Sequence, residues 1–321
     1  MRVGAIDCGT NSIRLLIADL GNGGGVDGTA ATLTDVVRLN TIVRLGQGVD
    51  ATGWLAQEAL DRTFAATEEY ARLLKEHGVE SVRFVATSAT RDAGNRHVFV
   101  NGIRERLGVE PEVISGEEEA ALSFAGAALV APPTNAEDRV LVVDLGGGST
   151  EFVLGSSEGI IAARSVDVGC VRMTERHLGS NPPTERQQQA VLEDVDRAID
   201  HVLQAVPLGE TQSLVGVAGS VTTITAHALG LDDYDAERLN GTVLEAQKIR
   251  TACRELTEMT REQRAELPFM HPGRVDVIGG GALVWGRILE RVMQETSGRV
   301  HSATTSEHDI LDGIALSLTS D

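Results

Sequence analysis

The sequence has few cysteines, few aromatic residues and no long apolar run. Its three cysteines, Cys8, Cys170 and Cys253, share no metal-ligand spacing and cannot all pair, so we expect them to be reduced, apolar residues. Two Tyr, two Trp and six Phe provide no aromatic platform for single-stranded nucleic acid. No stretch of about eighteen apolar residues occurs, and the chain opens MRVGAID, which predicts neither a membrane span nor a signal peptide. We therefore expect a cytoplasmic protein without membrane contact.

Positive charge is also scarce, since 28 Lys and Arg face 47 Asp and Glu for a net charge of -19. Such a surface argues against nucleic-acid binding, which needs a basic footprint on the protein. A phosphate-rich substrate would have to be held by local arginines, backbone N–H groups and a bound cation. The sequence contains no Walker A loop, Gly-x-Ser-x-Gly elbow or His-Glu-x-x-His, which weakens the interpretations as P-loop NTPase, serine hydrolase and zinc protease.

The most informative positive feature is an internal repeat. The segment 2–12, RVGAIDCGTNS, is echoed by 139–149, RVLVVDLGGGS, and Asp144 follows Asp7 by 137 residues. Each copy has the pattern of a buried strand, an acid, a glycine-containing turn and a returning strand, which predicts a β-hairpin with Asp and backbone donors at its tip. A repeat of this length indicates two duplicated lobes.

Strand and helix patterns alternate through both lobes, which is typical of α/β proteins. We expect helices over 57–77, 96–107 and 184–206, one opening at Gly116, and strands over 81–86, 112–114 and 213–217. Residues 275–293 are expected to form a strand, a glycine turn and a helix, and Ser306 with Asp309 predicts a capping box for a last helix over 307–318. The expected lobes are 1–124 and 125–321, and the last helix is free to pack back on the first lobe.

The two hairpin tips are the best candidates for phosphate chemistry. An Asp beside glycines suits a phosphate bridged to the carboxylate by Mg²⁺, because small residues let the phosphate oxygens come close. An Asp-x-Gly turn alone is often only a tight hairpin, but three consecutive glycines weaken a strand pair and need a reason. The candidate metal ligands are Asp7 and Asp144. The candidate phosphate-binding residues of the tips are Gly9, Thr10, Asn11, Ser12, Gly146, Gly147, Gly148 and Ser149.

Three further segments carry candidates whose structural alternatives stay open. The acids 117–119 open an expected helix, where acids also serve the helix dipole, but one of them facing a metal-bound phosphate would suit a general base. Arg91 follows an expected strand and is either a phosphate clamp or a surface arginine. Gly219 and Ser220 open a helix, which is either an anion site or a plain turn from strand to helix.

Five motifs, in this order, resemble the exopolyphosphatase and guanosine-pentaphosphate phosphohydrolase family, within the superfamily of actin, sugar kinases and chaperone ATPases. They span nearly the whole chain, and the closest similarity is to short, two-lobed actinobacterial-type members. The resemblance implies a duplicated actin-like (ribonuclease H-like) ATPase fold with a cleft between the lobes. The motifs are DCGTNS from Asp7, ATSATR to Arg91, GEEEA with Glu119, DLGGGSTE from Asp144 to Glu151, and GVAGS to Ser220.

The resemblance also implies roles for matched residues. Glu119 aligns with the catalytic base, Arg91 with a phosphate-contacting arginine, Glu151 with an acid near the metal and water, and Asp144 with a carboxylate associated with Mg²⁺. Thr10 stands where serine is common and keeps the hydroxyl. The implied reaction is attack of water on a terminal phosphoryl group. A monovalent cation such as K⁺ is a further candidate cofactor.

The implied substrate is inorganic polyphosphate, from which terminal orthophosphate would be released. Two alternatives stay open: hydrolysis of guanosine pentaphosphate to the tetraphosphate, and a nucleotide-binding sensor of low turnover. Longer members carry a further C-terminal helical domain, for which this sequence has no counterpart before it ends at Asp321. This departure leaves processivity on long polymers open, and a homodimer, if it forms, would not be built through that domain.

Overall fold

The computed structural model describes residues 1–21 and 32–318 and divides the chain into two compact units. The first unit comprises Met1–Gly126 together with Ile310–Asp321, and the second comprises Ala127–Asp309. The last helix, α13 (Ile310–Leu316), belongs to the first unit and packs there on strand β1. The sequence predicted a boundary between residues 124 and 125, and the two units meet between residues 126 and 127.

The first unit is built on a five-stranded mixed sheet in the order β3-β2-β1-β4-β5. Strands β1, β2 and β3 pair antiparallel, while β4 and β5 continue the sheet in parallel with β1. Every residue of β1 after Arg2 is buried, as the apolar run at the N-terminus predicts. The strand bounds are β1 Arg2–Cys8, β2 Ser12–Gly21, β3 Thr32–Ile42, β4 Ser81–Ala86 and β5 Glu112–Val113.

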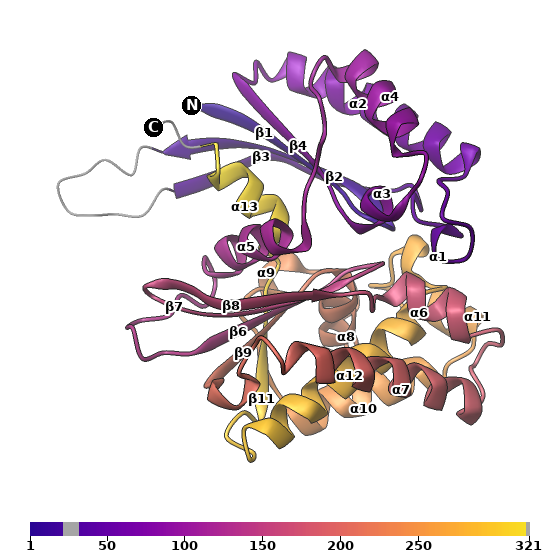
Figure 1. The fold of residues 1–321 in the computed structure, drawn as a ribbon, viewed down its shortest axis with the longest axis vertical. Coiled ribbons are helices and arrows are strands. Elements are labelled where there is room, and N and C mark those ends of the chain that lie inside the picture. The colour runs from indigo at the N-terminus through magenta and orange to yellow at the C-terminus, as the bar shows by residue number, and fades with distance from the viewer. Residues whose placement is uncertain (22–31, 319–321) are drawn as a thin grey trace. The chain divides into compact units, whose positions relative to one another are not determined.

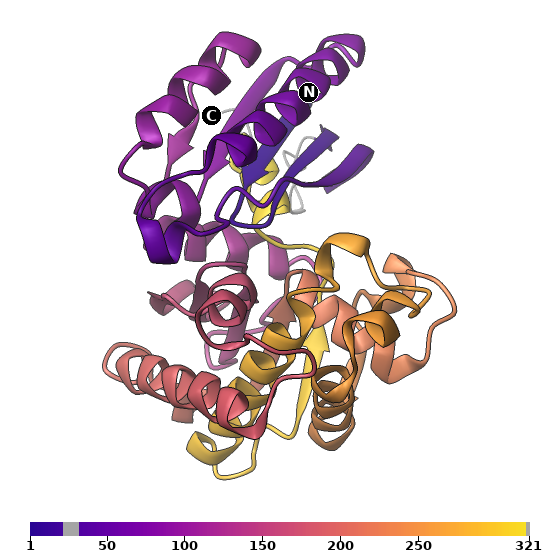
Figure 2. The ribbon, with the colours of Figure 1, turned by 90° about the vertical axis from the view of Figure 1, so that its right-hand side faces the viewer.

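Helices cover both faces of this sheet. The long helices α2 and α4 pack side by side on one face, over Ile6 and Cys8 of β1 (Figures 1 and 2). Helix α13 covers the other face, over Val3 and Ala5 (Figure 1). The bounds are α1 Val49–Thr52, α2 Gln57–Glu76, α3 Ser88–Asp92, α4 Arg96–Leu107 and α5 Gly116–Ala127. Gly78, with φ of 63°, follows α2 as the predicted stop.

The second unit contains a six-stranded sheet in the order β10-β11-β9-β6-β7-β8. Strands β6, β7 and β8 pair antiparallel, and β9 and β11 extend the sheet in parallel with β6. The strand bounds are β6 Val140–Leu145, β7 Thr150–Ser156, β8 Gly159–Val166, β9 Ser213–Val217, β10 Val243–Glu245 and β11 Ser302–Thr305.

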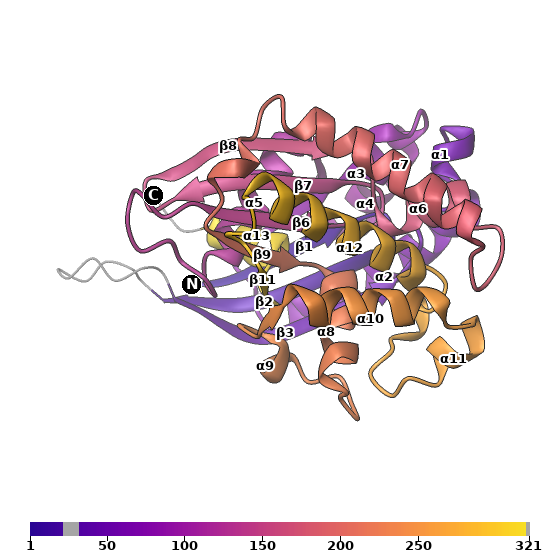
Figure 3. The ribbon, with the colours of Figure 1, turned by 90° about the horizontal axis from the view of Figure 1, so that it is seen from below.

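Helices α7, α12 and α10 lie side by side on one face of this second sheet (Figure 3). They contribute Val195, Trp285 and Ile249 to a core cluster. The same cluster contains Val143 of β6 and Phe152 of β7, so the helices and the sheet share one core. The helix bounds are α6 Cys170–His177, α7 Glu185–Val202, α8 Gly219–Leu229, α9 Ala236–Leu239, α10 Ala246–Glu258, α11 Arg261–Ala265 and α12 Ile278–Glu295.

The two units share one topology. Read outward from β1, the first sheet has two antiparallel strands on one side and parallel strands on the other, and β6 in the second sheet has the same neighbours. The repeat seen in the sequence therefore corresponds to duplicated actin-like units, each of α/β class. Within the described residues, no helix combines the length and apolar character needed to span a membrane.

Three sequence-based expectations were wrong in detail. No strand forms at 275–278; the residues Gly279, Gly280 and Gly281 lie inside α12, where added Cβ atoms would press on neighbouring side chains and backbone. The glycines thus serve close helix packing and make no turn. The last helix begins at Ile310 and not at 307, because the Ser306 side chain bonds the N–H and carbonyl of His308 in a local turn instead of a capping box. Helix α7 spans Glu185–Val202, where the sequence predicted a helix over 184–206.

Candidate functional site

The tip of the first hairpin, residues 9–12, is called here the first loop. Its turn is closed by a hydrogen bond from the N–H of Gly9 to the carbonyl of Ser12 at 3.0 Å. The carbonyls of Thr10 and Asn11 accept three hydrogen bonds, of 2.8, 2.9 and 3.1 Å, from the N–H groups of segment 43–46. The carbonyl side of the first loop is therefore fixed to its own unit.

The second loop, residues 146–149, repeats this arrangement. The N–H of Gly146 donates to the carbonyl of Ser149 at 3.1 Å, the counterpart of the first loop's closing bond. The carbonyls of Gly146 and Gly147 accept N–H groups from the first turn of α6 at 2.9 to 3.1 Å. The carbonyl of Gly148 accepts the Arg172 guanidinium at 2.7 Å. All three glycine carbonyls thus accept hydrogen bonds from residues of α6.

Apart from the N–H groups of Gly9 and Gly146, which close the two turns, five N–H groups of the loops are available for a ligand. Among residues 1–21 and 32–318, no hydrogen-bond acceptor is found for the N–H groups of Thr10 and Asn11, or for those of Gly147, Gly148 and Ser149. Thr10, Gly148 and Ser149 are buried. Buried N–H groups are costly without an acceptor, and a row of them makes a concavity for anionic oxygens. This geometry is what the predicted phosphate-binding loops require.

The acid beside each loop has a different cross-strand partner. In the first hairpin Asp7 stands opposite Arg14, whose guanidinium donates to Asp7 Oδ2 at 2.6 and 2.9 Å. In the second hairpin Asp144 stands opposite Glu151. Both pairs occupy the same register, because Arg14 and Glu151 each lie seven residues after their acid. Arg14 thus offsets the charge of Asp7 through Oδ2, while the buried Oδ1 takes no part in these two bonds, so Asp7 stays a candidate metal ligand.

Asp144 and Glu151 are suited to a divalent cation. Directly opposed side chains on an antiparallel pair have Cβ atoms about 5 Å apart, and these two carboxylates are only 7% and 1% exposed. Two buried like charges at this separation need positive charge beside them. Mg²⁺ is typically held by one or two carboxylates together with substrate phosphates and water. No cluster of three or more metal-ligating side chains occurs in the part of the chain that the structure describes.

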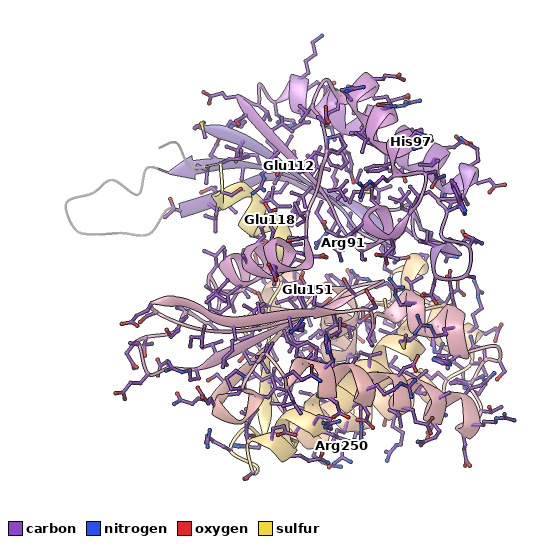
Figure 4. The ribbon with its side chains drawn as sticks, viewed as in Figure 1. Arg91, His97, Glu112, Glu118, Glu151 and Arg250 are labelled. Atoms are coloured by element: carbon purple, nitrogen blue, oxygen red, sulfur yellow. The ribbon has the colours of Figure 1, made fainter. Side chains whose placement is uncertain are left out.

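Only one of the three acids that open α5 is buried. Glu119 is 7% exposed, and its Oε2 accepts Arg91 Nη1 at 3.0 Å, a nitrogen that also donates to the carbonyl of Ile114. Glu118 instead bonds Arg83 on β4, beside Glu112 (Figure 4). A guanidinium at this distance favours the ionised carboxylate of Glu119, the form that accepts a proton from water. The structure therefore brings the predicted base and the predicted arginine together.

The turn into α8 combines a strained backbone with an arginine. Ala218, just before Gly219, has φ of 73° and ψ of 169°, a conformation that is rare outside glycine. The Arg274 guanidinium lies against Gly219, where a Cβ atom would overlap it, and donates to Thr223 Oγ1 at 3.1 Å. Backbone N–H groups at the helix start and the Arg274 guanidinium are thus the groups that this turn offers to an anion.

All three cysteines are buried and free, which confirms the expectation of reduced, apolar residues. Burial raises the pKa of the Cys8 thiol, with a smaller contribution from Asp7, and burial also raises the pKa of Cys170 against the opposing hydrogen bond from Ser220. Neither thiol is therefore a nucleophile at neutral pH.

Sequence reasoning missed three arginines. The spacing of the repeat contained a signal for Arg14, since an antiparallel hairpin with a tight tip places residues 7 and 14 opposite each other, as it does 144 and 151. Arg172 and Arg274 carried no such signal, because each reaches its loop or turn from an element that is distant in sequence.

This topology and these matched loops define a protein of duplicated actin-like fold. The chain belongs to the Ppx/GppA phosphatase family, whose profile matches residues 25–318. It is 50% identical to Exopolyphosphatase 2 of Mycobacterium tuberculosis, over 99% of this chain and 98% of that protein. It is also 31% identical to the guanosine-5'-triphosphate,3'-diphosphate pyrophosphatase of Photobacterium profundum, over 71% of this chain and 44% of that longer protein.

Solved structures agree with this assignment. A protein described as exopolyphosphatase-like superposes with a TM-score of 0.92 at 45% identity, with 98% of each chain covered. The Ppx/GppA family member from Aquifex aeolicus superposes with a TM-score of 0.78 at 29% identity, covering 99% of this chain and 97% of that one.

Proposed function

We propose that the protein is an exopolyphosphatase that releases terminal orthophosphate from inorganic polyphosphate with Mg²⁺ as cofactor. The observation that carries the phosphate chemistry is the pair of matched loops: neighbouring segments hydrogen-bond their carbonyls, while the N–H groups of Thr10, Asn11 and residues 147–149 have no acceptor in the described residues. The choice of polyphosphate is supported by the relative named Exopolyphosphatase 2, which is 50% identical over 99% of this chain. The buried, free cysteines suit a reducing cytoplasm.

Each group has a part in a single displacement. Glu119 accepts a proton from the attacking water while Arg91 holds its carboxylate, and a P–O bond forms to that water as the bond to the bridging oxygen breaks. The shortened polyphosphate leaves with the electron pair of the broken bond. The loop N–H groups and Arg274 offset charge on the phosphate oxygens. Mg²⁺, held at Asp144 beside Glu151, would neutralise phosphate charge.

The second candidate is hydrolysis of guanosine pentaphosphate. The observation that favours it is the relationship to guanosine-5'-triphosphate,3'-diphosphate pyrophosphatases, at 31% and 32% identity over 71% of this chain. The same loops and carboxylates would serve both substrates, because the bond broken is a phosphoanhydride in each case.

The test is phosphate release by purified protein with Mg²⁺, comparing short polyphosphate, long polyphosphate and guanosine pentaphosphate at equal concentrations of terminal phosphate. Glu119→Gln is the control for contaminating phosphatases, since the amide cannot accept the proton. Preference for polyphosphate that disappears in the variant supports the proposal. Preference for the nucleotide establishes the second candidate instead, and no release from any substrate, with binding retained, would favour a sensor.

A further inference from the structure

A hydroxyl group stands in line with the two carboxylates of the second hairpin. Asp144 on β6 pairs with Glu151 on β7, and Glu151 pairs in turn with Ser165 on the edge strand β8. Directly opposed residues of antiparallel strands project from the same face of a sheet. The three side chains therefore form one row across three strands.

The hydroxyl of Ser165 donates to Glu151 Oε1 at 2.7 Å. A hydrogen bond to an ionised carboxylate is among the stronger ones that a side chain makes; here the acceptor Glu151 is 1% exposed and the donor Ser165 is half-buried. The backbone ladder between β7 and β8 is regular from Thr150 to Leu154, and its bulge comes only beyond Leu154. Backbone pairing thus fixes the place of Ser165 relative to Glu151.

The hydrogen bond from Ser165 restricts the Glu151 side chain, which also feels repulsion from Asp144. Glu151 has three rotatable side-chain bonds, and Asp144 beside it carries the same charge, so repulsion favours rotamers that turn Glu151 away from Asp144. Ser165 holds Oε1 on the β8 side, away from Asp144, so the hydrogen bond and the repulsion favour the same orientation and together restrict the Glu151 side chain. In the first unit the same cross-strand place opposite Arg14 is taken by Asn40, and Arg14 is held instead by Asp7.

We propose that Ser165 is a positioning residue, which fixes the Glu151 carboxylate through Oε1 in the orientation that the phosphohydrolase reaction uses. The inference rests on the proposed function, because it assigns Ser165 a task in that same site. Ser165 acts through Glu151 and does not touch substrate. Its loss should therefore lower turnover and leave substrate affinity almost unchanged.

Four variants test this. Ser165→Ala removes the hydroxyl, Ser165→Val removes it while filling the space of threonine, Ser165→Thr keeps it, and Ser157→Ala removes an exposed hydroxyl beyond the end of β7 as the matched control. With Mg²⁺ and short polyphosphate, we expect Ser165→Ala and Ser165→Val to lower kcat by about 10- to 100-fold, as is usual for groups that orient a metal-associated ligand. KM should stay within about 2-fold, and Ser165→Thr should recover most of kcat.

A second readout needs no turnover. Binding of Mn²⁺ to the substrate-free protein, followed by electron paramagnetic resonance, should be about tenfold weaker in Ser165→Ala than in wild type and near wild type in Ser165→Thr. If wild type releases no phosphate, the proposed function fails, and the Mn²⁺ titration alone decides the role of Ser165. Equal kcat or equal Mn²⁺ affinity in wild type and Ser165→Ala overturns the inference, as does identical behaviour of the Thr and Val variants.

Discussion

Gly169, the residue before α6, controls how closely that helix approaches the second loop. Its φ of -155° and ψ of 165° describe extended backbone that any residue adopts, so Gly169→Ala adds no conformational strain. The new Cβ would lie 2.5 Å from the carbonyl carbon of Gly147, 2.7 Å from the nitrogen of Gly148 and closer still to the Gly147 oxygen. These are all backbone atoms, which cannot rotate away as a side chain can.

The size of the effect follows from those distances. Non-bonded carbon atoms rest at about 3.5 to 4.0 Å, so loop and helix must separate by roughly 1 Å, and the hydrogen bonds from α6 to the loop carbonyls lengthen or break. Overpacking of this kind costs about 1–3 kcal/mol of unfolding free energy. A displacement of about 1 Å in a substrate-positioning loop lowers turnover by about 100-fold.

Two measurements on the same preparation check these values: thermal unfolding reports the loss of stability, and phosphate release reports the loss of turnover. Gly179→Ala is the matched control in the same unit, because its Cβ would meet only the end of the flexible Gln187 side chain at 3.4 Å. At a temperature well below its unfolding transition, where the protein is still folded, we expect Gly169→Ala to have lost turnover. The control Gly179→Ala should keep its turnover at that temperature. Wild-type turnover in Gly169→Ala would refute the argument that α6 supports the loop.

Further predictions concern the base, the cofactor and stability. Glu119→Gln should keep the fold and substrate binding but lower kcat by about 100-fold or more; near wild-type kcat would remove Glu119 from the reaction. Excess chelator should abolish phosphate release and added Mg²⁺ restore it, and full activity in chelator would contradict the cofactor assignment. Arg264, 2% exposed, donates at 2.8 and 3.1 Å to two carbonyls in the last turn of α10. Arg264→Leu should therefore cost about 2–4 kcal/mol in denaturant unfolding, and an unchanged midpoint would contradict this. Burial, and then the nearby Arg274, lowers the pKa of His271 from its ordinary 6.5, so folding favours the neutral ring and stability is lost as pH falls below that value. His271→Asn, which keeps an acceptor for a neighbouring N–H, should lose less of its melting temperature between about pH 7 and pH 5; an equal loss would show that His271 is not responsible.

The backbone of both hairpins was predictable because its information is local. A buried apolar run, an acid and a glycine turn recur at a fixed offset, and β1 with β2 and β6 with β7 form as expected. The same local interpretation failed at Gly279 to Gly281. A run of glycines looks like a turn until the residues that press on it, Arg264 for one, are known. That contact joins residues distant in sequence, so no local pattern contains it.

The candidate site divides in the same way. The loops, Asp144 and Glu119 come from motifs that can be read in order along the chain. Residue type alone left the acids 117–119 equivalent and the resemblance pointed to Glu119, which the structure buries and pairs with Arg91. The supporting groups, Arg172 behind the second loop and Ser165 beside Glu151, depend on which strand or helix lies next in space. Sequence patterns thus identified the groups proposed to meet phosphate, while the groups that orient them required the tertiary structure.

Duplication has left two hairpins of the same backbone with opposite electrostatic demands. At the position seven residues after the acid, the first hairpin carries Arg14 and the second carries Glu151. The first pair is neutral by itself, since the guanidinium lies 2.6 Å from Asp7. The second pair concentrates two carboxylates that the chain buries almost completely, and a protein of net charge -19 supplies no general positive field to balance them. The residue seven positions after the acid therefore makes the second hairpin the pair of like charges, and it is there that we propose the cation is held.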